Sequence, residues 1–155
     1  MSDQPATARH GLGKPDIVPI EAGVAAVEWG RVRFADLPQF HCAARARVAA
    51  ALSKQTVEGG AGITFSRGPS GDGIELAPGV MIRGSFTPAD DVTVERIPAG
   101  SAAHLKLEAG YENLPQAWAE LTAWVESQKL LPAGQCWEVY GDPAVPVTDL
   151  YIRLK

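Results

Sequence analysis

The sequence contains two similar halves, and this internal duplication limits the possible folds more than any other feature. Residues 36–39 (Asp-Leu-Pro-Gln) have the signature of a helix start, because an Asp side chain can accept hydrogen bonds from free amide groups and proline suits the first turn. Residues 113–116 (Asn-Leu-Pro-Gln) repeat that signature. Each helix start follows an extended stretch that ends at a glycine, Gly30 or Gly110, and precedes two further extended stretches. The chain is therefore expected to contain a strand-helix-strand-strand unit twice.

Hydrophobic periodicity places the individual elements of each unit. Apolar residues at intervals of three and four predict one helix from residue 36 to about 55 and another from residue 113 to about 131. Residues 59–62 are expected to form a flexible glycine-rich connection. The stretches expected to be strands are 17–30, bent at its proline, and 63–66, 74–76, 80–82, 92–97, 102–108, 135–141 and 148–155.

These elements predict an α+β fold with an antiparallel sheet, two main helices and pseudo-two-fold symmetry. A chain of 155 residues, 46% of them hydrophobic, can bury the core of one globular domain. Residues 1–15 are polar and small, so we expect a mobile N-terminal tail there. Residues 16–155 are expected to form a single domain, with half-repeats at about 17–85 and 92–155 and a ligand groove between them.

Charge and cysteine content exclude several functional classes. A net charge of -4 opposes binding to a nucleic-acid backbone. No apolar run reaches the roughly 20 residues that a membrane-spanning helix needs. Cys42 and Cys136 lie far apart in the sequence and predict neither a disulfide nor a zinc site, so no metal or cofactor is expected. These features indicate a cytoplasmic protein with no direct nucleic-acid partner and no membrane partner.

The strand predicted at residues 135–141 carries a carboxylate in apolar surroundings. Because side chains alternate along a strand, Cys136, Glu138 and Tyr140 are expected on one face. Trp137 and Val139 are expected on the other, buried face. The face that holds the acid and the phenol is therefore the candidate site.

The first half of the chain serves as an internal comparison for this strand. Thr64 and Ser66 occupy the positions that match Glu138 and Tyr140, so the scaffold itself needs neither an acid nor a phenol there. A carboxylate among aromatic rings loses hydration, and its pKa is expected to rise unless a cation or hydrogen-bond donors accompany it. Such an acid suits either a cationic ligand or acid-base catalysis, and the sequence leaves both open.

Several motifs together resemble the GyrI-like small-molecule-binding family. They are Gly110-Tyr111, the helix with the Leu-Pro start that contains Trp124, and residues 137–140 (Trp-Glu-Val-Tyr) followed by residues 142–143 (Asp-Pro). The similarity spans roughly residues 17–155. This family includes the effector-binding domains of AraC-type and multidrug-sensing regulators and shares the SOUL-like duplicated architecture. The resemblance implies an aromatic-lined cleft with the acid of the Trp-Glu-Val-Tyr motif at its floor.

The resemblance implies three candidate functions. The first is a stand-alone module that binds an amphipathic, aromatic or cationic small molecule, with Glu138 as counter-charge and with Tyr140, Tyr111 and Trp118 as further ligand-binding residues. The second is a hydrolase of strained cyclopropane-bearing compounds, in which Glu138 and Tyr140 would be catalytic. The third is a protein-binding module of the gyrase-inhibitor type, so that gyrase or a separate regulator would be the protein partner.

Each candidate residue also has a purely structural interpretation. Glu138 fits a solvated or salt-bridged position on a strand. Tyr111 fits a packing residue at the entry to the second helix, and Trp118 lies on the apolar stripe of that helix and fits its core-facing side. The sequence leaves these alternatives open beside the functional ones.

Overall fold

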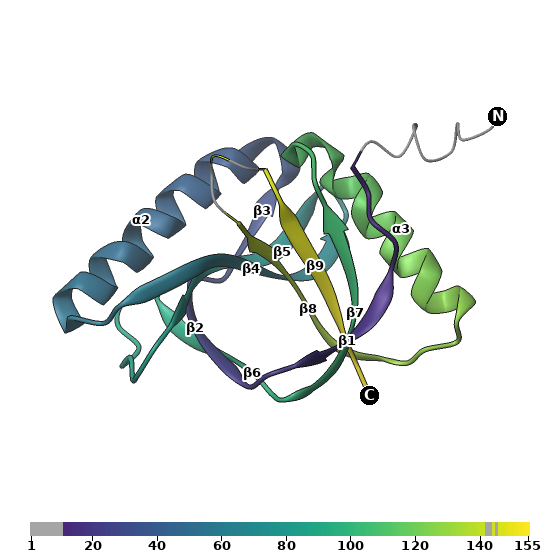
Figure 1. Ribbon diagram of the computed structural model, residues 1–155. Helices are drawn as coiled ribbons and strands as arrows, with labels where there is room; N and C mark the ends of the chain where they lie inside the picture. The colour runs from purple at the N-terminus through teal and green to yellow at the C-terminus, as the bar shows by residue number, and fades with distance from the viewer. Residues whose placement is uncertain (1–10, 142–143, 145) are drawn as a thin grey trace.

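The described residues form a large antiparallel sheet with two helices on one side, which is an α+β fold as predicted (Figure 1). The structure is a computed structural model that describes residues 11–141, 144 and 146–155. The helices are α2 (Leu37–Gln55) and α3 (Leu114–Ser127), and each follows a short 3-10 turn, η1 (Phe34–Asp36) or η2 (Tyr111–Asn113). The strands are β1 (Asp16–Ile20), β2 (Gly23–Val27), β3 (Gly30–Arg33), β4 (Gly59–Ser70), β5 (Gly73–Ile82), β6 (Thr93–Ile97), β7 (Gly100–Leu107), β8 (Pro132–Tyr140) and β9 (Thr148–Leu154).

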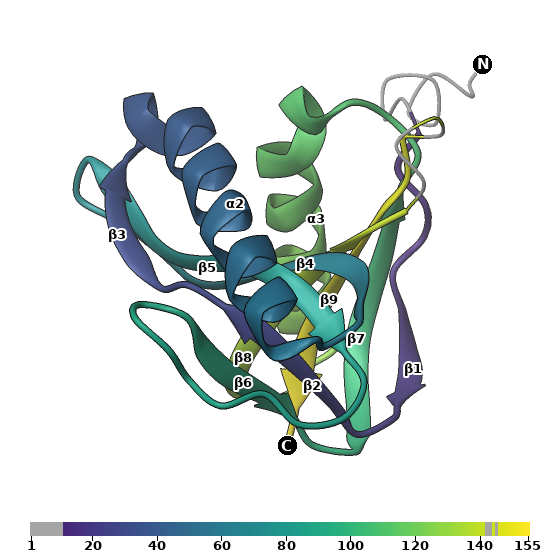
Figure 2. The same ribbon diagram turned by 90° about the vertical axis from the view of Figure 1, so that its left-hand side faces the viewer.

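The centre of the sheet is a pair of strands, one from each half of the chain. The strand order is β1-β7-β9-β8-β4-β5-β2-β6, with β3 added beside β5. Helix α2 packs on β5 and β2, whereas α3 packs on β7 and β9. Figure 2 shows the two helices side by side on the same side of the sheet. Strands β4 and β8 therefore lie where the part of the sheet covered by α2 meets the part covered by α3. Their residues on the helix side of the sheet lie at this boundary.

The pairing of β4 with β8 has the symmetry that the sequence repeat predicts. In the repeat, residues 63–65 correspond to residues 137–139 in the same order. In the sheet they pair in reverse order, as Ile63 with Val139, Thr64 with Glu138 and Phe65 with Trp137. If each residue is replaced by its counterpart in the other half, the pair Ile63–Val139 becomes the pair Trp137–Phe65, and the pair Thr64–Glu138 becomes itself. An approximate two-fold axis therefore passes between Thr64 and Glu138.

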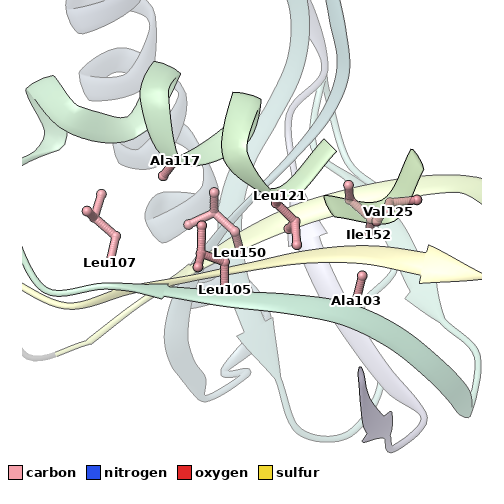
Figure 3. Close-up of a cluster of buried hydrophobic side chains, with 8 residues drawn as sticks. All are labelled: Ala103, Leu105, Leu107, Ala117, Leu121, Val125, Leu150 and Ile152. Atoms are coloured by element: carbon pink, nitrogen blue, oxygen red, sulfur yellow. The ribbon is translucent and has the colours of Figure 1, made fainter. Parts of the chain in front are cut away.

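Three apolar clusters form the core and decide which face of β8 points to the helices. One lies between α3 and the strands β7 and β9, as Figure 3 shows, and its buried members are Ala103, Leu105, Leu107, Ala117, Leu121, Val125, Leu150 and Ile152. A second lies beneath α2 and contains Val48 and Leu52. The third contains Phe65 and Trp137 from the central strands. Because strand residues alternate, Glu138 lies on the face opposite Trp137, as predicted.

The first half of the chain has more strands than predicted. A single bent strand at residues 17–30 is wrong, because the structure has β1 beside β7, β2 between β5 and β6, and β3 beside β5. Residues 59–62 were expected as a connection, but they form the start of β4. The three short strands form because each has a different partner, so the chain turns between them. At residues 59–62, pairing with β5 outweighs the local preference of glycine for a break.

The helix ends also differ in detail from the prediction. Both helices begin near the predicted positions, but neither Asp36 nor Asn113 makes a side-chain capping hydrogen bond. A preceding 3-10 turn leads into each helix instead. Helix α3 ends at Ser127, four residues before the predicted end. No helix in the described part of the chain is long and apolar enough to cross a membrane.

The predicted tail at residues 1–15 lies largely outside the described residues. From Gly11 onward the chain runs beside the end of β7. There the Gly13 amide donates to the Lys106 carbonyl at 2.8 Å, and the Glu108 amide donates to the Gly11 carbonyl at 2.8 Å. Contacts with the sheet thus begin before residue 16, and the division into tail and domain stays a prediction.

The substitution Gly79→Ala is expected to destabilise the fold. At this glycine β5 passes so close to β2 that an added Cβ would collide with the carbonyl oxygen of Ala26. Since the obstacle is backbone, we expect a loss of about 2 kcal/mol or more in the free energy of unfolding, measured by urea denaturation. The matched control is Gly100→Ala, where an added Cβ meets no atom within 4 Å. Similar losses in the two variants would contradict the close approach of the strands.

Candidate functional site

The approximate two-fold axis brings Glu138 to the middle of the helix side of the sheet. Strand β8 supplies Glu138 and Tyr140, and β4 supplies Thr64 directly opposite Glu138. Helix α3 reaches the same place with Trp118, and α2 reaches it with Arg45. Side chains from four elements and both halves of the chain therefore converge on one carboxylate.

Two uncharged donors hold the Glu138 carboxylate. The indole Nε1 of Trp118 donates to Oε2 at 2.7 Å, and the Tyr140 hydroxyl donates to Oε1 at 2.5 Å. Each carboxylate oxygen thus has one donor. Among the described residues, no Lys, Arg or His side chain forms an ion pair with Glu138. The carboxylate is therefore oriented by hydrogen bonds and has no ion-pair partner in the described part of the chain.

Arg45 acts on the carboxylate through two hydroxyl groups. Its Nη2 donates to Thr64 Oγ1 at 2.9 Å, and Thr64 Oγ1 lies 2.8 Å from the Tyr140 oxygen. Tyr140 has a single hydroxyl hydrogen, which it gives to the ionised Glu138, so the Thr64 hydroxyl donates to Tyr140. The Arg45 guanidinium also lies over the Tyr140 ring, 5.1 Å from its centroid. A directed chain of hydrogen bonds therefore runs from Arg45 to Glu138.

Burial changes the protonation chemistry of this network. It raises the pKa of the Glu138 carboxyl, and the hydrogen bonds from Trp118 and Tyr140 and the charge of Arg45 offset only part of that rise. Burial, followed by the charge of Glu138, also raises the pKa of the Tyr140 hydroxyl. Tyr140 therefore keeps its proton and remains a donor, whereas the ionised form of Glu138 carries a desolvation penalty.

Tyr111 lies at the outer side of this network. Its side chain is 60% exposed, and its ring meets the Tyr140 ring edge-on with 5.8 Å between the centroids. It precedes α3 as the exposed Phe34 precedes α2. The structure thus brings Glu138, Tyr140 and Trp118 into direct contact and places Tyr111 beside them. The Asp-Pro pair that follows the motif, residues 142–143, lies outside the described residues.

Sequence reasoning missed three residues of this region: Arg45, Thr64 and His41. The helical pattern of α2 assigns Arg45 to the solvent side, and the repeat comparison treats Thr64 only as part of the scaffold. His41 follows Leu37 by four residues, as Trp118 follows the matching leucine of α3. Burial, followed by the charge of Arg45, lowers the pKa of His41 to about 4. Aligning the two helices residue by residue would have marked His41 as the partner position of Trp118.

The two cysteines lie in different surroundings. The Cys136 thiol donates to the Ser66 carbonyl at 3.1 Å, and burial raises its pKa to about 11. Cys42 is an exposed thiol on α2. In the part of the chain that the structure describes, no group of three or more His, Cys, Asp and Glu side chains could hold a metal ion. The chemistry of this region therefore rests on the network around Glu138.

Comparison with known proteins gives matches in structure alone. No family model and no curated protein matches the sequence. The C-terminal domain of EcmrR has a similar structure, with a TM-score of 0.78 and 14% identity over 92% of this chain and 97% of that domain. SAV2435 bound to tetraphenylphosphonium gives 0.58 and 9% over 92% of this chain and 94% of that one. A hydrolase from Listeria innocua gives 0.60 and 10% over 99% and 97%.

The two helices, the antiparallel sheet and these structural neighbours agree with the architecture that the sequence motifs imply. The chain has a GyrI-like fold. EcmrR in complex with DNA gives a TM-score of 0.78 and 13% identity, and the match covers 98% of this chain but 60% of that one. The GyrI-like unit described here therefore spans about three fifths of the EcmrR chain in that complex. At these identities the likeness is one of fold.

The stability of this GyrI-like domain is expected to depend on pH through Glu138. Burial raises the pKa of its carboxyl above the ordinary value of 4.5, so the folded protein binds the proton more tightly than the unfolded chain. The resulting stabilisation is complete below the unfolded-state pKa and is lost as the pH rises through the folded-state pKa. Glu138→Gln cannot ionise, so the wild type should lose stability relative to this variant as the pH rises above about 4.5 and through the raised pKa of Glu138.

Urea denaturation of both proteins at several pH values measures this difference. All other titrating groups are shared, and their contributions therefore largely cancel between the wild type and the isosteric variant. A difference in free energy of unfolding that stays constant across the pH range would contradict the raised pKa of Glu138.

Proposed function

We propose that this chain is a small-molecule-binding module of the effector-binding type that captures an amphipathic aromatic ligand, cationic in the preferred case. The ligand would lie between α2 and α3, with Glu138 as its counter-charge. One observation carries the proposal. The Glu138 carboxylate is held by two neutral donors, Trp118 and Tyr140, and forms no ion pair with the described residues.

The energetics of the site favour a cation. The ionised carboxylate has lost hydration, and a positive charge placed against it would recover part of that loss. The rings of Tyr111 and Trp118 offer π faces, which attract cations with an energy of about 0.5–2 kcal/mol each, whereas Arg45 already lies over the Tyr140 ring. An aromatic ligand that carries a positive charge would use both features. A neutral aromatic ligand would use the rings alone and bind more weakly.

One structural neighbour supports this class of ligand. SAV2435, which has the same fold, is known as a complex with tetraphenylphosphonium, an organic cation with four aromatic rings. EcmrR, whose C-terminal domain has this fold, is known as a complex with DNA. This chain carries a net charge of -4, so we propose no direct contact with nucleic acid. A separate protein, such as a regulator, would convert ligand binding into a response.

The substitution Glu138→Gln is expected to weaken the binding of tetraphenylphosphonium by about tenfold or more. Tetraphenylphosphonium has no hydrogen-bond donor, but opposite unit charges about 6 Å apart attract by about 3 kcal/mol at an effective dielectric constant of about 20. The amide keeps the shape of the acid while removing its charge, and a loss of about 1.4 kcal/mol is tenfold in affinity. Isothermal titration calorimetry measures the affinity. A neutral aromatic compound of similar size should bind the wild type and the variant alike.

The matched control is Glu126→Gln, which removes one negative charge from an exposed position on α3. It changes the net charge by the same amount as Glu138→Gln, so it separates a local effect from a general electrostatic one. Equal affinities of wild type, Glu138→Gln and Glu126→Gln for tetraphenylphosphonium would overturn the role of Glu138 as counter-charge.

Hydrolysis of a strained cyclopropane-bearing electrophile is the alternative function. It is favoured by the short hydrogen bond, 2.5 Å, between the Tyr140 hydroxyl and Glu138, which couples an acid of raised pKa to a phenol. Glu138 would activate water or protonate the leaving carbon. Since the single hydrogen of Tyr140 is given to Glu138, the exposed Tyr111 would be left to donate to a developing oxyanion.

An assay of product formation distinguishes the two functions. With a strained cyclopropyl electrophile, a hydrolase should show multiple turnovers that Glu138→Gln reduces by about 100-fold or more, the range typical of a general acid or base. A binding module should give stoichiometric binding without product. Turnover that is unchanged in Glu138→Gln would exclude catalysis by this acid.

A further inference from the structure

A hollow lies beside α2, and Glu138 is not among the residues that line it. It is a cavity of about 380 Å³ between the second half of α2, the start of β4 and β5. Apolar side chains line much of it, namely Val48, Leu52, Val57 and Val80. Its volume lies within the range of about 300–1,000 Å³ that is usual for small-molecule sites.

The local sequence explains why this space is left unfilled. Helix α2 ends at the left-handed Thr56, and β4 begins with Gly59 and Gly60, which have no side chains to place in the hollow. An added Cβ at Gly59 would come within 3.3 Å of Val80 and 3.4 Å of Leu52. The register of β4 and β5 shifts in this same region. The glycines thus keep an apolar wall open to a ligand.

Arg45 supplies the polar end of the cavity. Both Arg45 and Gly79 line it, and the Arg45 Nη1 donates to the Gly79 carbonyl at 2.9 Å. The other contacts of the guanidinium are the Thr64 hydroxyl, the Ile63 carbonyl at 3.5 Å and the ring of Tyr140. All of these partners are uncharged. No hydrogen bond of its Nε is present among the described residues, so a donor of the guanidinium is still available.

Arg45 differs from Arg47 and Arg67 in that no acidic side chain of the described residues is paired with it. Arg47, two residues further on α2, is paired with both oxygens of Glu28 at 2.7 and 2.8 Å. Arg67 is paired with Glu75 at 3.0 Å. In the part of the chain described, no carboxylate forms an ion pair with Arg45. A half-buried guanidinium without a contacting anion favours a carboxylate, which can accept a charge-assisted hydrogen bond from the free Nε–H.

We propose that this cavity is a second binding site, for an amphipathic carboxylate whose acid group binds Arg45 and whose hydrocarbon chain lies against Val48, Leu52 and Val80. The site goes beyond the function proposed for Glu138 and has the opposite charge preference. Because Arg45 also begins the hydrogen-bond chain to Glu138, the two sites share one residue. Each nevertheless has its own walls, rings at one and aliphatic side chains at the other.

Decanoate and decan-1-ol test the proposal, since they have the same hydrocarbon chain and differ in charge. Isothermal titration calorimetry below the concentration at which decanoate forms micelles should show that decanoate binds the wild type about tenfold or more tightly than decan-1-ol. Arg45→Met should abolish that preference. Equal affinities for the two compounds, or no binding of decanoate to the wild type, would overturn the proposal. This comparison uses the unaltered protein and does not depend on how a variant folds.

Ala49→Trp tests the location of the site. Ala49 lines the cavity from the exposed side of α2, so the indole should fill it and weaken decanoate binding by at least about tenfold. The matched control is Ala46→Trp, at an exposed position of α2 that does not line the cavity. Equal decanoate binding by Ala49→Trp and Ala46→Trp would overturn the assignment to this cavity.

Glu138→Gln separates this proposal from the function proposed above. The variant should keep its affinity for decanoate within about twofold while it loses affinity for tetraphenylphosphonium. If the protein binds tetraphenylphosphonium but not decanoate, only the proposal for the Glu138 site stands. If it binds decanoate but not tetraphenylphosphonium, only the proposal for the cavity stands. If Glu138→Gln loses as much affinity for decanoate as Ala49→Trp does, decanoate binds at Glu138 and not in the separate cavity. That result would overturn the proposal of a second site.

Discussion

The antiparallel pairing of β4 with β8 is the interaction on which the rest of the structure depends. It joins two halves that each have their own helix and apolar cluster, and its register sets Thr64 opposite Glu138. A slip of one residue would turn Glu138 towards the apolar face and Trp137 towards the helices. Full burial of a side chain such as Phe65 contributes about 1.5–3 kcal/mol, which opposes such a slip. Core packing on one face thus holds the polar site on the other.

The scaffold is symmetric, but the chemistry at its axis is not. Where one half has Glu138 the other has Thr64, and the helix position that holds Trp118 in one half holds His41 in the other. Two acids at the axis would lie directly opposite each other in a poorly hydrated place, and at least one would have to take up a proton. One half therefore supplies the acid with its donors, and the other supplies a hydroxyl and the guanidinium of Arg45. This division leaves Glu138 and Arg45 each without an ion-pair partner among residues 11–141, 144 and 146–155, which is the feature that both proposed sites use.

The sequence predicted correctly the features that depend on residues within a single helix or strand. The Leu-Pro motifs placed the starts of both helices, and alternation along residues 135–141 placed Trp137 in the core and Glu138 on the opposite face. The comparison of the two halves also marked Glu138 as an acid that the scaffold does not need. The first-half strands were less predictable, because β1, β2 and β3 owe their extent to partners far away in the sequence.

The sequence by itself determined the duplicated α+β architecture, its symmetry and the face on which Glu138 lies, because these follow from periodicity within single elements and from the repeat between them. Only the tertiary structure decided which side chains meet there. Arg45 was on the polar side of a helical pattern, yet it reaches Thr64 across the space between α2 and β4. The hollow beside α2 also depends on how far that helix stands from glycines that a sequence pattern assigns to a loop. Such contacts arise from the packing of whole elements, and local residue preferences do not encode that distance.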